Sequence, residues 1–212
     1  MTIVKICGLS SPEHLLVAAA AGADYIGLVF APSRRQVSIS TAQRLVATLR
    51  DAGYATQVVG LFVNESATTI AATVAACGLD VIQLHGTEAY DSIADLPPLP
   101  VWRALRLNGA ADESPWLATA DVRITPLIDA PMTATQFGGT GGFADWGAAA
   151  ALASQRRVVL AGGLTPDNVR TAIRQVAPWG VDVSSGVERA GYKDNGLIAA
   201  FIDLAKSASE VV

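Results

Sequence analysis

Several residue types are scarce in this chain of 212 residues, and each scarcity removes a class of protein. Two cysteines are too few for a disulfide framework and fit a reducing compartment, and no Cys/His spacing is typical of a metal site. Charged residues make up only 16%, with a net charge of −4 and no cluster of Lys and Arg, which argues against nucleic acid as a ligand. No apolar run is long enough to span a bilayer, and no signal-peptide pattern opens the chain. We therefore expect a cytoplasmic protein with no metal, no nucleic acid and no membrane as partners.

Apolar residues, by contrast, are plentiful: they make up 51% of the chain, which excludes disorder. Short β-branched runs alternate eight times with Ala- and Leu-rich helical patterns. Continuous apolar runs joined by helices indicate a parallel sheet that is buried on both faces. The expected strands are Ile3–Cys7, Tyr25–Phe30, Gln57–Val63, Val81–His85, Val101–Leu105, Ile124–Asp129, Val158–Leu160 and Val181–Ser184. The alternation predicts an α/β protein, a single-domain (β/α)₈ barrel over residues 1–212.

The expected strand ends follow one another at nearly regular intervals, with two longer steps. The extra residues fall in the loops Ala31–Ser38 and Ala130–Asp145, which we expect over the mouth of the barrel, where loops usually serve function. Because side chains alternate along a strand, Lys5, Arg103 and Asp182 are expected to point into the barrel. The first and last strands become neighbours when the barrel closes, so Lys5 is expected to pair with Asp182.

Two strands near the C-terminus each end in glycine, at Gly162-Gly163 and at Gly186, beside the hydroxyls of Ser184 and Ser185. A helix is expected to start after each, at Thr165–Asp167 and at Val187–Glu188. Glycine lets the backbone approach a ligand, and the free N–H groups of a helix start bind anions. A tight turn alone would show the same residues, but two such turns in tandem favour the phosphate site of a (β/α)₈ barrel.

Six segments resemble the phosphoribosylanthranilate isomerases of tryptophan biosynthesis. They are KICGL at 5–9, SRRQV at 33–37, QLHG at 83–86, GGTGG at 138–142, AGGLTPDNV at 161–169 and DVSSGVE at 182–188. The combination of KICG on the first strand with DVSSGVE on the last is specific. The resemblance implies an isomerase without metal or cofactor. It would convert N-(5-phosphoribosyl)anthranilate to 1-(2-carboxyphenylamino)-1-deoxyribulose 5-phosphate by an Amadori rearrangement.

By this resemblance Cys7 is the general base and Asp129 the general acid. A thiol has a reference pKa of about 8.5, which a nearby cation such as Lys5 can tune toward neutrality. Asp129 must carry a proton at the outset in order to donate it, which requires a partly desolvated site. The structural alternatives are a small buried hydrophobe at Cys7 and a turn cap at Asp129.

The resemblance also implies the residues that bind substrate. Arg35 would hold the anthranilate carboxylate, with Arg34 as a rival because the loop is one residue shorter than the family pattern. Gln83 and His85 either line the pocket or are simply held by hydrogen bonds. The remaining substrate-binding residues, around the phosphate and the sugar, are Gly162, Gly163, Asp182, Ser184, Ser185 and Gly186. The segment 138–146 departs from the family pattern, so no contact is assigned to it.

Two other functions stay open at this point. One is a different phosphate-binding barrel that acts on a sugar phosphate, and the other is a barrel that binds a phosphorylated ligand without catalysis. Cys7 within KICG, together with Asp129, disfavours both. Whether the chain is a monomer or a homodimer is not legible in the sequence.

Overall fold

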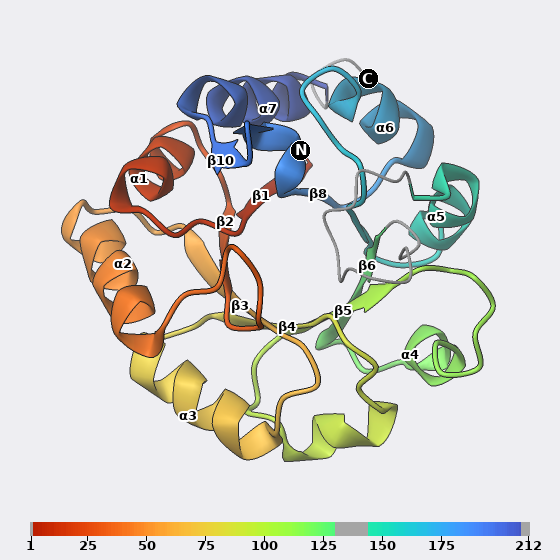
Figure 1. The fold of residues 1–212 in the computed structure, drawn as a ribbon. Helices are drawn as coiled ribbons and strands as arrows, with labels where there is room; N and C mark the ends of the chain where they lie inside the picture. Colours follow the sequence, from red (N-terminus) through yellow and green to blue (C-terminus); the bar gives the residue numbers. More distant parts are fainter. Residues whose placement is uncertain (1, 130–143, 209–212) are drawn as a thin grey trace.

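The computed structural model describes residues 2–129 and 144–208 and forms a closed barrel of eight parallel strands. Each strand pairs with the next along the chain, and the eighth pairs with the first. Helices surround the strands as an outer ring when the molecule is viewed along the barrel (Figure 1). The predicted (β/α)₈ barrel is confirmed.

The barrel strands begin and end within one residue of the predicted bounds. They are β1 Ile3–Cys7, β2 Tyr25–Val29, β3 Gln57–Phe62, β4 Val81–Leu84, β5 Val101–Leu105, β6 Ile124–Ile128, β7 Val159–Leu160 and β8 Gly180–Val183. Nearly all their residues are buried, because the outer face packs on helices and the inner face fills the barrel.

Local sequence explains where most helices start. The α-helices are α1 Pro12–Ala20, α2 Ile39–Asp51, α3 Ala67–Cys77, α4 Ser114–Ala118, α5 Trp146–Ala153, α6 Val169–Val176 and α7 Asn195–Ser207. Five of them begin after a residue whose side-chain oxygen accepts a hydrogen bond from an N–H of the first turn, which satisfies an otherwise unpaired donor. These capping residues are Ser11, Ser38, Ser66, Asp145 and Asp194.

The segment after β4 departs from the predicted alternation of strand and α-helix. It forms a 3₁₀-helix, η1 (Tyr90–Asp95), instead of an α-helix. Leu96 is extended, with φ of −79° and ψ of 153°, because the residue before a proline avoids the helical region, and Pro97 follows it. Pro98 and Pro100 then prevent any resumption of the helix before β5.

The two predicted helix starts near the C-terminus are also wrong in detail. A hydrogen-bonded turn over residues 165–168 comes first, so α6 begins at Val169. After β8 a single 3₁₀ turn, η2 (Ser185–Val187), leads into the short hairpin of β9 (Glu188–Arg189) and β10 (Tyr192–Lys193). Ala190 and Gly191 both have positive φ and reverse the chain there, so α7 starts only after Asp194.

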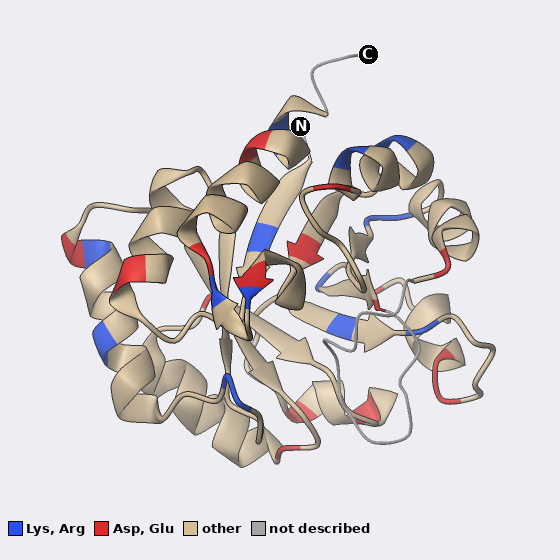
Figure 2. Cartoon of the chain, turned by 45° about the horizontal axis from the view of Figure 1, so that its top comes forward, with Lys and Arg blue, Asp and Glu red and all other residues tan. Residues whose placement is uncertain are grey.

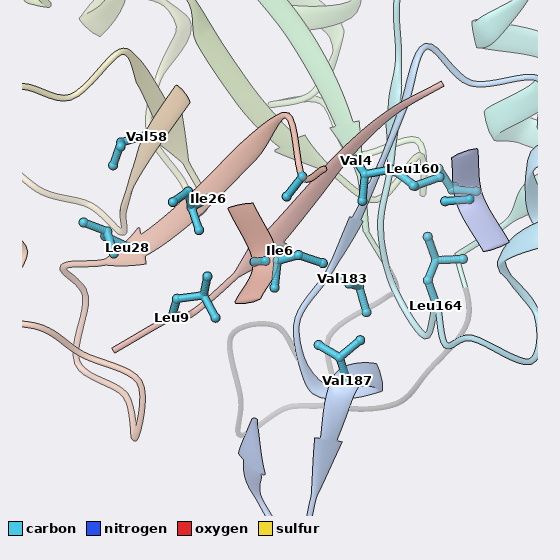
Figure 3. Close-up of a cluster of buried hydrophobic side chains, with 14 of the residues drawn as sticks. Val4, Ile6, Leu9, Ile26, Leu28, Val58, Leu160, Leu164, Val183 and Val187 are labelled. Atoms are coloured by element: carbon cyan, nitrogen blue, oxygen red, sulfur yellow. The ribbon is translucent and has the colours of Figure 1, made fainter. Parts of the chain in front are cut away.

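The core has two layers. Inside the barrel lie Val59, Val81, Trp102, Ala104, Leu127, Val159 and Ala161. A larger cluster packs between the strands and the helices, and Figure 3 shows part of it, including Val4, Ile6, Leu160 and Val183. Side chains of alternate parity on the same strands thus fill both layers.

Arg103 does not point into the barrel, contrary to the prediction. Its neighbour Trp102 occupies the interior, with ring centroids 4.8 Å from Tyr25. Arg103 instead lies between the sheet and the outer layer, where it pairs with Glu88 and its guanidinium carbon stands 5.0 Å from the Trp116 ring. The large indole fills the barrel interior, and the cation finds a carboxylate outside, which avoids an unpaired buried charge.

Charge is sparse and mixed in sign along the cartoon (Figure 2). In the part of the chain that the structure describes, none of the helices combines the length and the apolar character needed to cross a membrane.

Helix α7 covers the outside of the barrel, where it packs against both α1 and β1. Ile202 on this helix is fully buried. We predict that Ile202→Ala lowers the free energy of unfolding by about 2–5 kcal/mol, since it removes buried methylene groups and leaves a cavity. Val122→Ala is the control, because Val122 is 96% exposed and should change stability by less than about 0.5 kcal/mol. Urea unfolding followed by circular dichroism measures the free energy of unfolding of both variants. Equal losses of stability would contradict the placement of Ile202 in the core.

Candidate active site

The residues predicted for the site come together around one cavity of about 440 Å³ at the mouth of the barrel. This volume falls in the range of small-molecule sites. Every predicted site residue lines it: Cys7, Arg35, Gln83, His85, Asp129, Gly162, Gly163, Asp182, Ser184, Ser185 and Gly186. They reach it from β1, β4, β8 and the loops after β2, β6 and β7, as expected for the C-terminal face of such a barrel.

Cys7 is the last residue of β1 and is 5% exposed. Burial raises the pKa of its thiol, and the carboxylate of Asp182 acts in the same direction. The nearby ammonium groups of Lys5 and Lys193 oppose that rise, but the pKa still lies above its ordinary value. The neutral thiol is therefore the main form near pH 7, although the expected neighbour Lys5 is in place.

The predicted pair of Lys5 and Asp182 is present in full. Lys5 Nζ lies 2.8 Å from Asp182 Oδ2, and the two residues stand opposite each other in the register of β1 and β8. Burial alone would lower the pKa of Lys5, but the Asp182 carboxylate and the adjacent Cys7 raise it above its ordinary value. Lys5 thus stays a cation inside the barrel. Asp182 Oδ1 is buried and has no hydrogen-bond partner among the described residues.

Asp129 directly follows β6 and is 8% exposed. Its Oδ2 lies 3.0 Å from His85 Nε2, and His85 Nδ1 lies 3.0 Å from Gln83 Nε2. With the amide in this orientation Gln83 donates to Nδ1, so the imidazole proton sits on Nε2 and is donated to Asp129. Both interpretations of Gln83 and His85 therefore hold, because the two residues line the cavity and are fixed by hydrogen bonds.

Close backbone approach shapes the cavity wall where β7 and β8 end. Gly162 and Gly163 have φ of 74° and 70°, a region that other residues rarely adopt. At Gly186 a Cβ atom would lie 1.8 Å from the carbonyl oxygen of Leu164, so only glycine fits. Next to it, Ser184 Oγ donates to the carbonyl of Cys7 at 3.2 Å, which ties this wall to the end of β1.

The two arginines of the loop Ala31–Ser38 differ in position. Arg35 lines the cavity, and its side chain is 16% exposed. Arg34 is not among the described residues that line the cavity; its side chain is 51% exposed and donates to the carbonyl of Gly191. Position therefore favours Arg35 over Arg34. The other long loop, at Ala130–Asp145, and the segment 138–142 fall mostly or wholly outside the described residues.

Sequence reasoning missed one ion pair beside the cavity and one set of residues that line it. Glu188 and Lys193 form an ion pair, with Nζ 3.2 Å from Oε1, and both side chains are 5% exposed. Glu188 closes the DVSSGVE segment, so its place in that motif was the available signal. Val29, Leu61 and Val63 give the cavity an apolar wall, which strand parity at the ends of β2 and β3 could have indicated.

Comparisons with known proteins agree with this geometry. Residues 4–204 match the family model of N-(5'phosphoribosyl)anthranilate (PRA) isomerase. The N-(5'-phosphoribosyl)anthranilate isomerase of Roseiflexus castenholzii is 46% identical, over 98% of this chain and 99% of that relative.

Solved structures agree as well. The crystal structure of phosphoribosyl anthranilate isomerase from Thermotoga maritima has a TM-score of 0.85 and 36% identity, and the match covers 98% of this chain and 100% of that one. Another solved phosphoribosyl anthranilate isomerase, in complex with reduced 1-(o-carboxyphenylamino)-1-deoxyribulose 5-phosphate, has a TM-score of 0.81 and 34% identity, with the same coverage. By fold, by the clustering of its motifs around one cavity and by similarity over nearly its whole length, the chain belongs to the N-(5'-phosphoribosyl)anthranilate isomerase family.

Proposed function

We propose that this chain converts N-(5'-phosphoribosyl)anthranilate to 1-(o-carboxyphenylamino)-1-deoxyribulose 5-phosphate, with Asp129 as general acid and Cys7 as general base. The observation that carries the proposal is that this thiol and this carboxyl are both buried and line one cavity. They reach it from β1 and from the end of β6, which lie well apart around the ring of strands. An acid and a base so separated suit a reaction in which protons move at two different atoms.

Ring opening is the first step. Protonated Asp129 gives its proton to the furanose ring oxygen, the C1–O bond breaks, and the lone pair of the anthranilate nitrogen forms a Schiff base at C1. His85 holds the carboxyl by its hydrogen bond to Oδ2 and so fixes the direction of proton transfer.

Proton abstraction is the second step. The Cys7 thiolate removes the proton from C2, and the electron pair moves toward the cationic nitrogen to give an enolamine. In the final tautomerisation the enol O–H proton passes to the Asp129 carboxylate and C1 takes a proton from the Cys7 thiol. C2 becomes a ketone, C1 becomes a methylene group, and both catalytic groups return to their starting forms. Lys5 stabilises the thiolate because its ammonium group forms a hydrogen bond to Cys7.

The rest of the cavity binds the two ends of the substrate. Backbone N–H groups around Gly163 and Ser184–Gly186 take the phosphate, and Arg35 takes the anthranilate carboxylate. The apolar wall of Val29, Leu61 and Val63 suits the aromatic ring. Asp182 Oδ1, a buried acceptor, suits a sugar hydroxyl.

Family membership argues against a barrel that acts on a different sugar phosphate. A barrel that only binds would leave the substrate unchanged. The direct test is turnover of N-(5'-phosphoribosyl)anthranilate by the purified chain, followed through the loss of its anthranilate fluorescence. Growth of a tryptophan auxotroph that lacks this isomerase tests the same step in cells, and no turnover with no rescue would refute the proposal.

We predict that Cys7→Ala and Asp129→Ala each reduce kcat by at least about 10²–10⁴-fold, the usual contribution of a general acid or base. Both variants should still bind a reduced product analogue, because neither side chain holds the phosphate or the carboxylate. Cys77→Ala is the matched control, since that second buried thiol lies at the end of α3 and does not line the cavity. Near-normal turnover by either active-site variant would refute its assignment.

The raised pKa of Cys7 predicts a pH dependence. The active form is the thiolate, whose fraction increases as the pH rises toward a pKa above the ordinary value. We therefore expect kcat/KM to climb from about pH 6 to about pH 9, by up to about tenfold per unit. Stopped-flow rates at each pH measure this, and a rate that falls steadily across this range would contradict Cys7 as the base.

The two arginines of the loop can be separated by substitution. Arg35→Met should raise KM by about tenfold or more, since a charge-assisted hydrogen bond contributes about 1.5–3 kcal/mol. Arg34→Met should change KM by less than about threefold, because that side chain points to the β9–β10 hairpin. The opposite order in steady-state kinetics would transfer the role to Arg34.

A further inference from the structure

Glu188, the first residue of β9, gathers three cations around one buried carboxylate. Its Oε1 lies 2.7 Å from Arg35 Nε and 3.2 Å from Lys193 Nζ, and its Oε2 lies 2.5 Å from Arg34 Nη2. Burial alone would raise the pKa of Glu188, but the hydrogen bond from Arg35 and the charge of Lys193 lower it. The carboxylate is therefore ionised, and no step of the proposed mechanism uses it.

The contact with Arg35 is a fork. Arg35 Nε donates to Oε1 at 2.7 Å and Arg35 Nη2 donates to Oε2 at 3.1 Å, so Glu188 takes one edge of the guanidinium plane. Within the described residues Nη1, on the other edge, donates to nothing. A guanidinium can bind a carboxylate on each of two edges, so one edge is anchored while the other stays available in a residue that lines the cavity.

The same carboxylate is also connected to the turn after β8. Lys193 pairs with Glu188 and donates to the carbonyl oxygen of Ser184 at 2.8 Å. Ser184 lies in the wall to which we assign the phosphate. Glu188 thus links the loop Ala31–Ser38 to the turn after β8. Three cations against one carboxylate leave this corner with an excess of positive charge in a chain whose net charge is −4.

We infer that Glu188 is a positioning residue that presets Arg35 to receive the anthranilate carboxylate of the substrate. The inference rests on the proposed function, because it needs a substrate that carries that carboxylate. Arg35 has a long side chain with many rotamers, and holding it in place before binding removes an ordering cost from the binding step. Glu188 contributes to substrate affinity through Arg35 and takes no part in proton transfer.

The test is Glu188→Gln, which keeps the side-chain shape but removes the charge. We expect KM for N-(5'-phosphoribosyl)anthranilate to rise by about tenfold, with kcat changed by less than about threefold. With Arg35→Met already present, adding Glu188→Gln should change KM by less than about twofold, because the effect passes through Arg35. An unchanged KM, or the same tenfold rise with Arg35→Met present, overturns the inference.

Arg189→Gln is the matched control, since Arg189 lies on the same strand, is 75% exposed and pairs with Asp194 on the outside. It should leave both kinetic constants unchanged. Circular dichroism checks the fold, and if Glu188→Gln does not fold, Glu188→Asp takes its place in the same cycle. If Glu188→Asp raises KM equally with and without Arg35→Met, the inference is overturned in the same way. If the unmodified chain does not turn over the substrate, the proposed function fails; if it does and only the cycle fails, the role of Glu188 alone is refuted.

Discussion

The buried ion pair of Lys5 and Asp182 is the constraint on which the site depends. It lies across the seam where β8 meets β1, so it joins the two strands that complete the ring. Removing two charges from water is costly, and the close attraction between the Lys5 ammonium and the Asp182 carboxylate offsets that cost. The pair holds an ammonium group against Cys7, and the same carboxylate keeps that ammonium charged. One contact thus joins the two strands that complete the barrel and places a cation beside the thiol.

The pattern of apolar runs along the sequence predicted most of the fold. Continuous apolar runs such as Tyr25–Val29 and Val101–Leu105 can be buried only in a parallel sheet with both faces covered, which left few alternatives to a barrel. Alternation along the strands then placed Lys5 and Asp182 correctly. The same rule failed for Arg103, because Trp102 occupies the interior position, where its indole packs against the tilted ring of Tyr25. Alternation along a strand allows either of two sets of side chains to face the interior, and packing against the other strands decides which set does so.

The sequence predicted those site residues that belong to local motifs. It did not predict the residues whose position depends on contacts between distant parts of the chain. Cys7 and Asp129 stand at strand ends, and the glycine turns have their own sequence pattern, so spacing and family resemblance were enough to predict that they meet. Glu188 and Lys193 lie on a hairpin whose existence the pattern did not reveal. Its contacts to Arg35 span more than 150 positions along the chain. No local pattern encodes a contact of that kind.

The raised pKa of the buried Cys7 thiol also affects how readily the protein is oxidised. Peroxides and electrophiles attack thiolates far faster than thiols, and they also require access to the sulfur. A cysteine that is 5% exposed and mainly protonated therefore reacts slowly with them. The burial that keeps the Cys7 thiol protonated near neutral pH thus also protects Cys7 from oxidation.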